Sequence, residues 1–460
     1  MIPKRPPQET EKQSNMFSVE LEDLVSLEHP LVRLSRQIPW EQFDKEFDPL
    51  YCQNFGRPAI ATRLMVGLHY LKHTFNLSDE DTVARWVENP YWQYFCGMKY
   101  FEHKVPIDPS SMTRWRKKVG EAGAEQMLAA TVEAGLKQGV IKPKSFNRVI
   151  VDTTVQEKAV CYPTDSRLYH AMREKLTAMA AEHGVPLRQS YERLSRNALL
   201  MASRYSHARQ MNRARKEIKK LKNYLGRVAR DIERKIQGDT EKQEAFAEAL
   251  AMARRLLEQQ RKSKNKLYSI HAPEVECISK GKSHKKYEFG VKVGIVTTSK
   301  ESFVIGVKAL PGNPYDAHTL ARSVESAEKI TGKKLIGDIL VDRGYRGHDY
   351  EGPATVHVVG MKKKEKPWRW RWKRRRAAIE PIIGHMKNDG QLGRNQLAGT
   401  EGDKINPILC GAGQNIRKLL REILFARLCR SLHCLILAFG RITTPLAKPL
   451  TPRCFMFLAA

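Results

Sequence analysis

The chain has 460 residues, which is too long for one ordinary compact core, so we expect two or three structural units. Lys and Arg number 80 against 50 Asp and Glu, and the net charge of +30 calls for a polyanionic partner, most simply nucleic acid. The apolar stretch near the end is short and interrupted by His433, and the amino terminus lacks the apolar core of a secretory signal, so we expect neither a membrane-spanning nor a secreted protein. The eight cysteines have no zinc-site spacing, so we expect reduced thiols and a cytoplasmic location.

The residues from 24 to 115 predict a small helical domain. Ser78 followed by acidic residues and Pro109 followed by two serines are typical helix starts, and the second helix carries Arg114 and Arg116. Two capped helices of this kind fit a helix-turn-helix that reads the major groove, with both arginines on DNA. A plain helical bundle that packs or dimerises is the alternative.

From Phe146 onward the pattern becomes that of a sheet. The run NRVIVDTTV is rich in β-branched residues and predicts a buried strand that ends on Asp152. Four more runs bounded by Gly, Pro or charged residues follow, with a helix expected from Asp316 to Lys329. Strands that then alternate with helices indicate a mixed sheet with helices on its faces. The four runs are KKYEFGVKVGIVTT, SFVIGVKAL, KLIGDILVDRGYRG and TVHVVGM.

The region from Asp165 to Lys264 interrupts this sheet as a basic helical insertion. Apolar residues recur within it at alternating gaps of three and four, which predicts a coiled-coil seam surrounded by positive charge. A solvated helical hairpin and an arm that clamps DNA both fit this pattern. The seam consists of Ile218, Leu221, Leu225, Val228 and Ile232.

Two carboxylates at strand ends favour a metal site. Hard divalent cations such as Mg²⁺ take oxygen ligands, and Asp152 and Asp342 each close a strand-like run. Gly344 permits a sharp exit after the second strand, and Arg343 and Arg346 add charge that suits DNA phosphates.

Other acidic residues compete for this role. Asp338 has the same side parity as Asp342, but we favour Asp342 because sites on such sheets lie at strand ends. Asp316 and His318 could support the site from behind, although capping of the next helix is the simpler role for Asp316. Two more acids are expected in loops, namely Asp389 and Asp403.

Glu380 follows a dense basic run and precedes an amphipathic stretch. Arg376, Glu380 and Lys387 lie at offsets of four and seven, so one continuous helix would carry them on one face. Pro381 disfavours a helix interior, so we expect the helix to start near Glu380, with Arg376 in the approach to it. A carboxylate there would be ionised and available to metal and phosphate.

The run from Lys362 to Arg376 interleaves basic residues with Trp368, Trp370 and Trp372. Positive charge beside aromatic faces suits melted or single-stranded DNA, with arginines on phosphates and Trp370 stacked on a base. A strand whose alternating Trp residues face the core is the alternative.

Together these segments resemble the DDE transposases of bacterial insertion sequences, in particular the IS-five family. The signature around the third carboxylate of that family is Tyr, two residues, Arg, three residues, Glu, six residues, Lys. Three of its four positions match here, at Arg376, Glu380 and Lys387, and Lys373 replaces the Tyr. Further segments are similar in sequence to that family, so the resemblance covers residues 17–424. These segments are SSMTRWRKKVG, VDTTVQEKAVCYPTDSRLYH, ALPGNPYDAHTL and GDKINPILCGAGQNIRKLL.

The resemblance implies an α/β, ribonuclease H-like mixed sheet flanked by helices, with an N-terminal helical domain and a long helical, coiled-coil insertion. It implies that the sheet domain is the catalytic one. The boundaries we expect are 1–118 for a DNA-binding or dimerisation domain, 119–164 and 271–424 for the catalytic domain, 165–270 for the insertion and 425–460 for a tail.

The resemblance also implies a reaction. Asp152, Asp342 and Glu380 would hold two Mg²⁺ ions, or Mn²⁺, and catalyse cleavage at terminal inverted repeats and joining to target DNA. Arg376, Lys387 and Lys373 would contact end phosphates, with a solvent-facing role as the alternative for Lys387. We expect a homodimer in the synaptic complex, at the bacterial nucleoid. The rivals are a ribonuclease H-like nuclease and a domesticated copy that only binds DNA.

Overall fold

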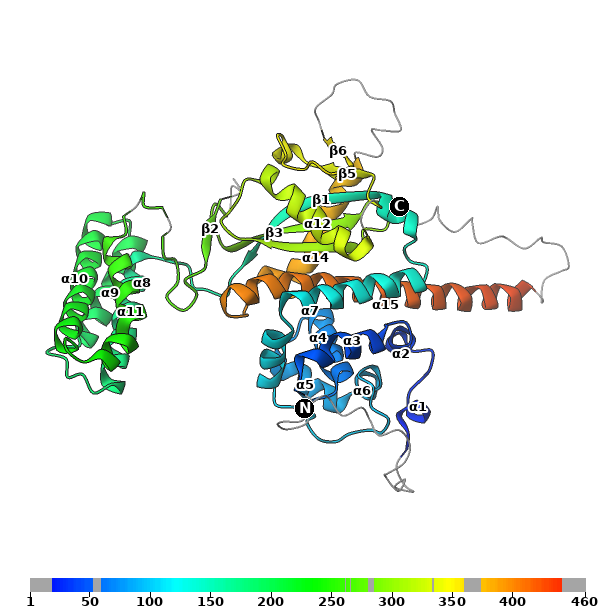
Figure 1. The fold of residues 1–460 in the computed structure, drawn as a ribbon, viewed down its shortest axis with the longest axis horizontal. Helices are drawn as coiled ribbons and strands as arrows, with labels where there is room; N and C mark the ends of the chain where they lie inside the picture. The colour runs from blue at the N-terminus through cyan, green and yellow to red at the C-terminus, as the bar shows by residue number, and fades with distance from the viewer. Residues whose placement is uncertain are drawn as a thin grey trace.

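The computed structural model shows a central sheet domain, a helical N-terminal part and a separate helical bundle (Figure 1). A long C-terminal helix runs between the first two parts. Within the described chain, no helix is long and apolar enough to cross a membrane. The structure describes residues 19–52, 59–260, 262–264, 266–279, 285–332, 335–359 and 374–440.

The N-terminal part is helical, as predicted. The helix start at Ser78 is confirmed, because its hydroxyl accepts a hydrogen bond from the Asp81 amide at 2.9 Å. The second predicted start is confirmed at Ser110, but the predicted cap is not, because no side chain caps the helix at Pro109. Its helix has a non-helical residue at Gly120, with φ 63° and ψ −160°. The helices are α1 Leu21–Leu24, α2 Pro30–Ser35, α3 Trp40–Phe47, α4 Thr62–Phe75, α5 Asp79–Glu88, α6 Pro90–Phe95 and α7 Ser110–Lys137.

A six-stranded mixed sheet forms the centre of the molecule. Strand β1 pairs antiparallel with β3 and parallel with β5, and β5 pairs parallel with β6. Both β2 and β4 pair antiparallel with β3. The predicted strands are confirmed, and β2 was not predicted. The bounds are β1 Arg148–Glu157, β2 Glu276–Ile278, β3 Glu288–Thr298, β4 Val304–Leu310, β5 Asp338–Val341 and β6 Thr355–Val358.

Asp152 lies within β1 rather than at its end. It is opposite Ile295 of β3, and the ladder continues as far as Glu157, opposite Gly290. The residues after the carboxylate are Thr, Thr and Val, which favour a strand, so the extended conformation does not stop at the charge.

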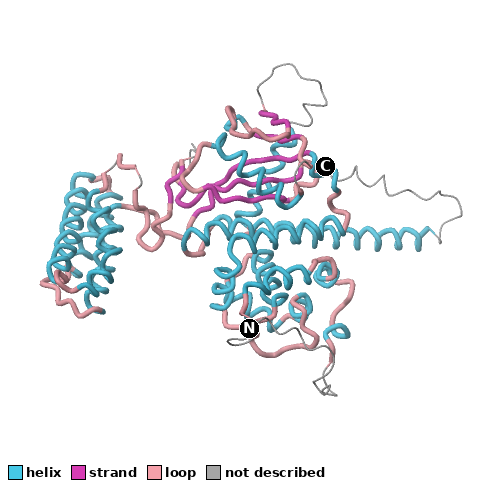
Figure 2. The backbone as a smooth tube through the Cα atoms, viewed as in Figure 1, coloured by secondary structure: helices cyan, strands magenta, loops and turns pink. Residues whose placement is uncertain are grey.

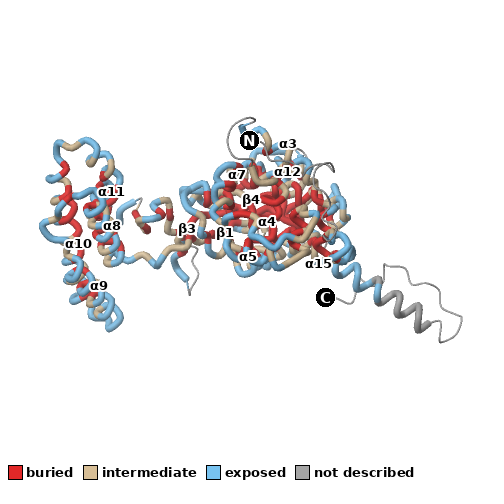
Figure 3. The backbone as a smooth tube through the Cα atoms, turned by 90° about the horizontal axis from the view of Figure 1, so that it is seen from below, coloured by how far each residue is buried: buried red, intermediate tan, exposed pale blue. Residues whose placement is uncertain are grey.

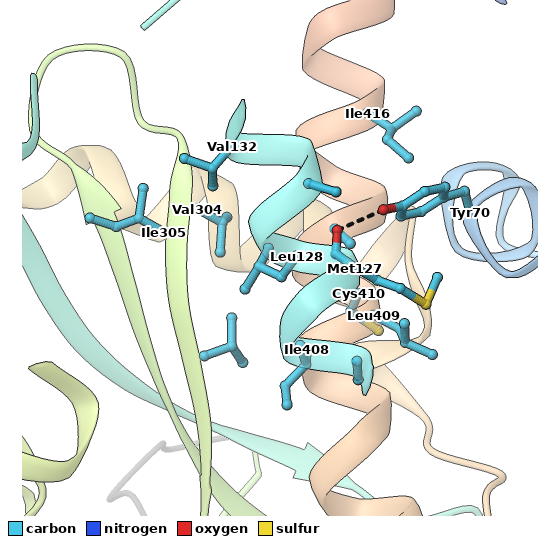
Figure 4. Packing of buried hydrophobic residues seen from close by; sticks show 14 of the residues in the cluster. Tyr70, Met127, Leu128, Val132, Val304, Ile305, Ile408, Leu409, Cys410 and Ile416 are labelled. Carbon is cyan, nitrogen blue, oxygen red and sulfur yellow. Dashed lines mark hydrogen bonds between the residues drawn. The ribbon is translucent and has the colours of Figure 1, made fainter. Parts of the chain in front are cut away.

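Helices cover both faces of the sheet. The predicted helix after β4 is confirmed as a 3₁₀ turn, η3 Asp316–Thr319, followed by α12 Leu320–Thr331. It packs closely on β4, because a Cβ added at Gly306 would lie 2.8 Å from the Ala327 amide nitrogen. On the other face, α7 and the long helix α15, Gly399–Gly440, pack against β4 (Figure 4). The remaining helix, α14, spans Ile379–Asn388.

The interface of α15 joins the N-terminal helices to the sheet. Tyr70 of α4 donates a hydrogen bond of 2.7 Å to the Met127 carbonyl of α7, beside buried Ile408 and Cys410 of α15 (Figure 4). One hydrophobic core therefore continues from α4 through α7 and α15 into the sheet.

The insertion is a bundle of four helices joined to the sheet by loops (Figure 2). The predicted seam is buried at Leu221, Leu225, Val228 and Ile232, and these residues belong to a second hydrophobic core within the bundle. The helical prediction is confirmed, whereas the coiled-coil prediction is not, because the seam packs against three other helices. The bundle consists of α8 Asp165–Glu182, α9 Glu192–His207, α10 Met211–Lys235 and α11 Thr240–Glu258.

Candidate active site

Strands β1 and β5 bring two of the predicted carboxylates next to each other. Ile150 of β1 is paired with Leu340 of the parallel strand β5, so Asp152 and Asp342 both lie two residues beyond this pair. Equal offsets from a paired position give side chains on the same face, and neighbouring strands are about 4.8 Å apart. Asp342 follows the last residue of β5, as predicted, and its Oδ1 accepts a hydrogen bond of 2.9 Å from the Gly344 amide.

Arg376 connects the first predicted carboxylate to the third. One guanidinium nitrogen lies 3.5 Å from Asp152 Oδ2, and another lies 2.6 Å from Glu380 Oε1. The predicted helix start is confirmed, because α14 begins at Ile379 and Arg376 belongs to a preceding 3₁₀ turn. Asp152 and Arg376 are mostly buried, whereas the Glu380 side chain is 59% exposed and can reorient.

A fourth carboxylate, Asp316, lies in the same place. Its Oδ1 accepts hydrogen bonds from Thr153 Oγ1 at 2.9 Å and from Lys292 Nζ at 3.1 Å. A Cβ added at Gly344 would lie 3.1 Å from Asp342 Oδ1 and 3.3 Å from Asp316 Oδ2, so both carboxylates border this glycine. The expected capping role of Asp316 is wrong, because its side chain does not cap η3.

Tyr345 is close enough to three of these carboxylates for their charges to affect its phenol. Burial raises the pKa of its phenol well above the ordinary value, and the charges of Asp152, Asp316 and Asp342 raise it further. The side chain is fully buried.

Sequence reasoning missed Tyr345 and Lys292. Lys292 could have been noticed as a cation between the apolar residues of a predicted strand. A charge buried there requires a partner of opposite charge, which would have pointed to a nearby carboxylate. Among the residues that the structure describes, no three Asp, Glu, His or Cys side chains form a group that could hold a metal ion. The carboxylates are instead adjacent to the cations Arg376 and Lys292.

The predicted DNA contacts have different surroundings. Arg343 and Arg346 are exposed beside Asp342, and Arg114 is exposed on α7. Lys387 lies 3.9 Å from Glu288 of β3. Two further predictions lie outside the described residues, Lys373 and Trp370.

Arg116 does not fit the prediction of a DNA contact. Only 4% of its side chain is exposed, and its Nη1 donates a hydrogen bond of 2.8 Å to Asp79 Oδ1. A buried guanidinium paired in this way is not available to phosphates, so we assign it to the packing of α5 on α7.

The other acidic residues considered for the site contact basic residues elsewhere in the fold. Asp338 begins β5 and lies 2.8 Å from His357, whereas His318 is exposed on η3. Asp403 was expected in a loop but lies within α15, paired with Lys158 at 2.8 Å, and burial raises its pKa. Asp389 follows the end of α14 and lies 2.6 Å from His385.

Comparison with known proteins identifies the family. Residues 19–118 match a family model described as a transposase domain (DUF772), and residues 262–406 match the transposase DDE domain. An uncharacterized protein, ORF8 in the nfe locus of Rhizobium meliloti, is 52% identical over 206 residues, which are 45% of this chain and 99% of that protein. The chain belongs to the DDE transposases.

The DDE match covers only part of the candidate site of this transposase. Asp342 and Glu380 fall within the DDE match, whereas Asp152 lies before it, on the far side of the insertion. No solved structure matches the transposase. The family implies that it is an enzyme that acts on DNA and moves an insertion sequence by recombination.

Proposed function

We propose that this transposase cuts DNA at the terminal inverted repeats of its element and joins the freed ends to target DNA, with Asp152, Asp342 and Glu380 as its catalytic carboxylates. The bridge that Arg376 makes between Asp152 and Glu380 carries this proposal, because it brings a carboxylate from α14 to a carboxylate on the central strand. Asp342 reaches the same face through the pairing of β5 with β1.

The sheet order supports a ribonuclease H-like assignment for the catalytic domain. Three antiparallel strands in the order β4, β3 and β1 continue into the parallel strands β5 and β6. The family resemblance implies an Asp on the first strand, an Asp after the fourth and a Glu on a later helix. Asp152 is on β1, Asp342 follows the strand after the helix-covered crossover, and Glu380 is in the first turn of α14.

The residues present fit divalent cations once the exposed Glu380 side chain turns from Arg376 toward Asp152 and Asp342. Carboxylate oxygens are the ligands that Mg²⁺ and Mn²⁺ prefer, and the Arg376 guanidinium marks a position between two of them where a positive charge is stabilised. Two such ions, when bound there, would activate the attacking hydroxyl and stabilise the leaving oxygen of an in-line displacement.

The neighbouring cations supply phosphate contacts in this proposal. Arg376 transfers its hydrogen bonds from Glu380 to the phosphate that is cut, which frees the carboxylate as a ligand. Arg343 and Arg346 are exposed beside Asp342 and hold adjacent phosphates. Lys387 follows on the same helix, near Glu288, and holds a more distant one. A homodimer brings two ends together.

An end-joining assay tests the catalytic assignment. The full chain is incubated with a duplex that carries the inverted repeats flanking its gene, a target plasmid and Mg²⁺ or Mn²⁺. We expect Asp152→Ala, Asp342→Ala and Glu380→Ala each to abolish joining while duplex binding in band shifts persists. Asp338→Asn is the matched control and should join at the parental rate.

The same assay separates the rival functions. Cleavage without joining would indicate a nuclease of the same fold, and binding without either reaction would indicate a DNA-binding protein only. Full joining activity in all three alanine variants would overturn the carboxylate assignment.

A further inference from the structure

The solvent face of α10 is a continuous basic stripe. Residues that recur at gaps of four and three are all exposed, and they lie on the side of the helix opposite buried Leu221, Leu225 and Ile232. We call this set the outer face of α10; it consists of Lys216, Lys220, Asn223, Arg227, Arg230 and Arg234.

The acidic side chains of α10 already have partners. Glu217 lies 2.8 Å from Lys220, Asp231 lies 2.9 Å from Lys235, and Glu233 lies 2.8 Å from Arg254 of α11. All three are half-buried at the flanks of the helix. Asp231 also lies 3.4 Å from Arg234, so the five cations of the outer face outnumber the two acids that contact it, Glu217 and Asp231.

A hollow of about 1120 Å³ continues the basic surface at the C-terminal part of α10. Its lining includes Tyr191, whose hydroxyl accepts a hydrogen bond of 3.3 Å from Arg227 Nη1. A concave surface of this kind can follow a convex ridge of phosphates. The arginines that line it are Arg188, Arg227, Arg230, Arg234 and Arg254.

We propose that the outer face of α10 binds the phosphate backbone of double-stranded DNA. At 1.5 Å per residue, the stripe from Lys216 to Arg234 is about 27 Å long. That length matches roughly eight base pairs, since each strand carries one phosphate per about 3.4 Å. The inference rests on the proposed function, because it assigns a second contact to the same DNA substrate.

The position of α10 determines which part of the DNA it holds. The chain enters the bundle through α8 and leaves it through α11, whereas α9 and α10 lie farther from the sheet (Figures 1 and 3). The outer face therefore binds duplex outside the segment that occupies the carboxylate site. Backbone contacts of this type anchor and orient DNA without reading its sequence.

Two triple variants of the full chain, matched in charge, test this surface. Arg227→Gln, Arg230→Gln and Arg234→Gln together remove three charges from the outer face of α10. Arg193→Gln, Arg196→Gln and Arg204→Gln remove three exposed charges from α9. The binding of a 40-base-pair duplex with the inverted repeat is measured by fluorescence anisotropy between roughly 50 and 200 mM salt, the range over which phosphate contacts lose affinity steeply.

The α10 triple should weaken binding at least tenfold at the higher salt. It should also reduce the slope of log K against log salt by about 0.9 for each phosphate that the variant no longer neutralises. The α9 triple should change the affinity and the salt slope by much less. Circular dichroism checks that both triples keep the parental helix content, and since all six positions are exposed we expect no loss.

The outcomes separate this inference from the proposed function. Equal weakening by both triples, or none by the α10 triple, would overturn the α10 surface while leaving the catalytic assignment intact. A parent chain that binds no duplex at all would contradict the proposed function and the surface with it.

Discussion

Asp316 is the residue whose contacts connect the candidate ligands to each other. It accepts a hydrogen bond from Thr153, the neighbour of Asp152, and it borders Gly344, which binds Asp342. Lys292 of β3 donates a hydrogen bond to the same Asp316 carboxylate. These contacts place Asp316 next to the neighbours of Asp152 and Asp342, and we expect it to act as a positioning residue for both.

Asp316→Asn should lower the joining rate by about 10- to 100-fold, as loss of outer-shell partners of metal ligands generally does. Asn keeps the shape of the side chain but removes the charge that Lys292 balances. We expect a higher Mg²⁺ concentration for half-maximal joining, with duplex binding unchanged. Asp349→Asn, at an exposed acid that caps α12, is the control. An unchanged Mg²⁺ requirement would limit Asp316 to a structural role.

A buried charged cluster stabilises the N-terminal helices. Asp79 of α5 lies 2.7 Å from Lys72 Nζ of α4 and accepts two hydrogen bonds from Arg116 of α7. Burial opposes ionisation of Asp79, but the hydrogen bonds from Arg116 and the charge of Lys72 outweigh it and hold its pKa well below the usual range. Burial and the charge of Arg116 lower the pKa of neighbouring His69 to about 3.

Asp79→Asn should lower the free energy of unfolding by about 3–5 kcal/mol at pH 7, because it leaves two buried cations without their carboxylate. A depressed pKa stabilises the fold above the ordinary carboxyl value of about 3.9 and loses that effect as the pH falls below it. The parent should therefore lose more stability than the variant between roughly pH 5 and 2.

Urea unfolding across this pH range measures both effects. Asp81→Asn, at an exposed acid two residues away, should stay within about 0.5 kcal/mol of the parent. Parallel pH profiles for the parent and Asp79→Asn would show that Asp79 does not carry the acid sensitivity.

The features of the site that could be predicted are those that local sequence determines. The approach of Arg376 to Glu380 follows from helical spacing, and the place of Asp342 follows from the end of an apolar run. The roles of Lys292 and Arg116 arise from contacts between segments far apart in the chain, which spacing does not reveal.

At the scale of elements, α15 and α4 approach so closely that only glycine fits between them. A Cβ added at Gly413 would lie 2.5 Å from the His73 carbonyl oxygen, which belongs to the backbone of α4. The backbone atoms cannot rotate away as a flexible side chain would.

Gly413→Ala should destabilise the fold by about 1–3 kcal/mol through overpacking. Gly384→Ala is the control, because a Cβ at Gly384 of α14 meets no atom within 4 Å, and it should stabilise the helix by about 0.5–1 kcal/mol. Differential scanning calorimetry of both variants gives the comparison. Equal melting temperatures would show that α4 and α15 separate at little cost.

Most elements were predictable, but their partners were less so. Runs of β-branched residues located the strands, and periodicity located the buried stripe of α10, whereas the other helices of the insertion were predicted only as a helical region. Apolar residues at gaps of three and four in α10 predict a buried stripe, and such a stripe occurs both in coiled coils and in four-helix bundles. The number of helices that pack on it could therefore not be predicted from the sequence.

At the scale of the whole molecule, the described residues of the transposase form two hydrophobic cores. One lies within the helical bundle, and the other extends from the N-terminal helices through α15 to the sheet. Asp152 and Asp342 belong to segments on opposite sides of the bundle in sequence. The insertion can therefore vary while the sheet keeps both carboxylates together.

The position of α15 determines when the protein can finish folding on the ribosome. Buried residues of α15, such as Ile408, Ile416 and Ile423, complete the core to which α4 and α7 contribute. Those N-terminal helices are synthesised some three hundred residues earlier, and their apolar faces stay exposed until α15 has emerged. We therefore expect a chain cut short before α15 to expose these apolar faces and to aggregate.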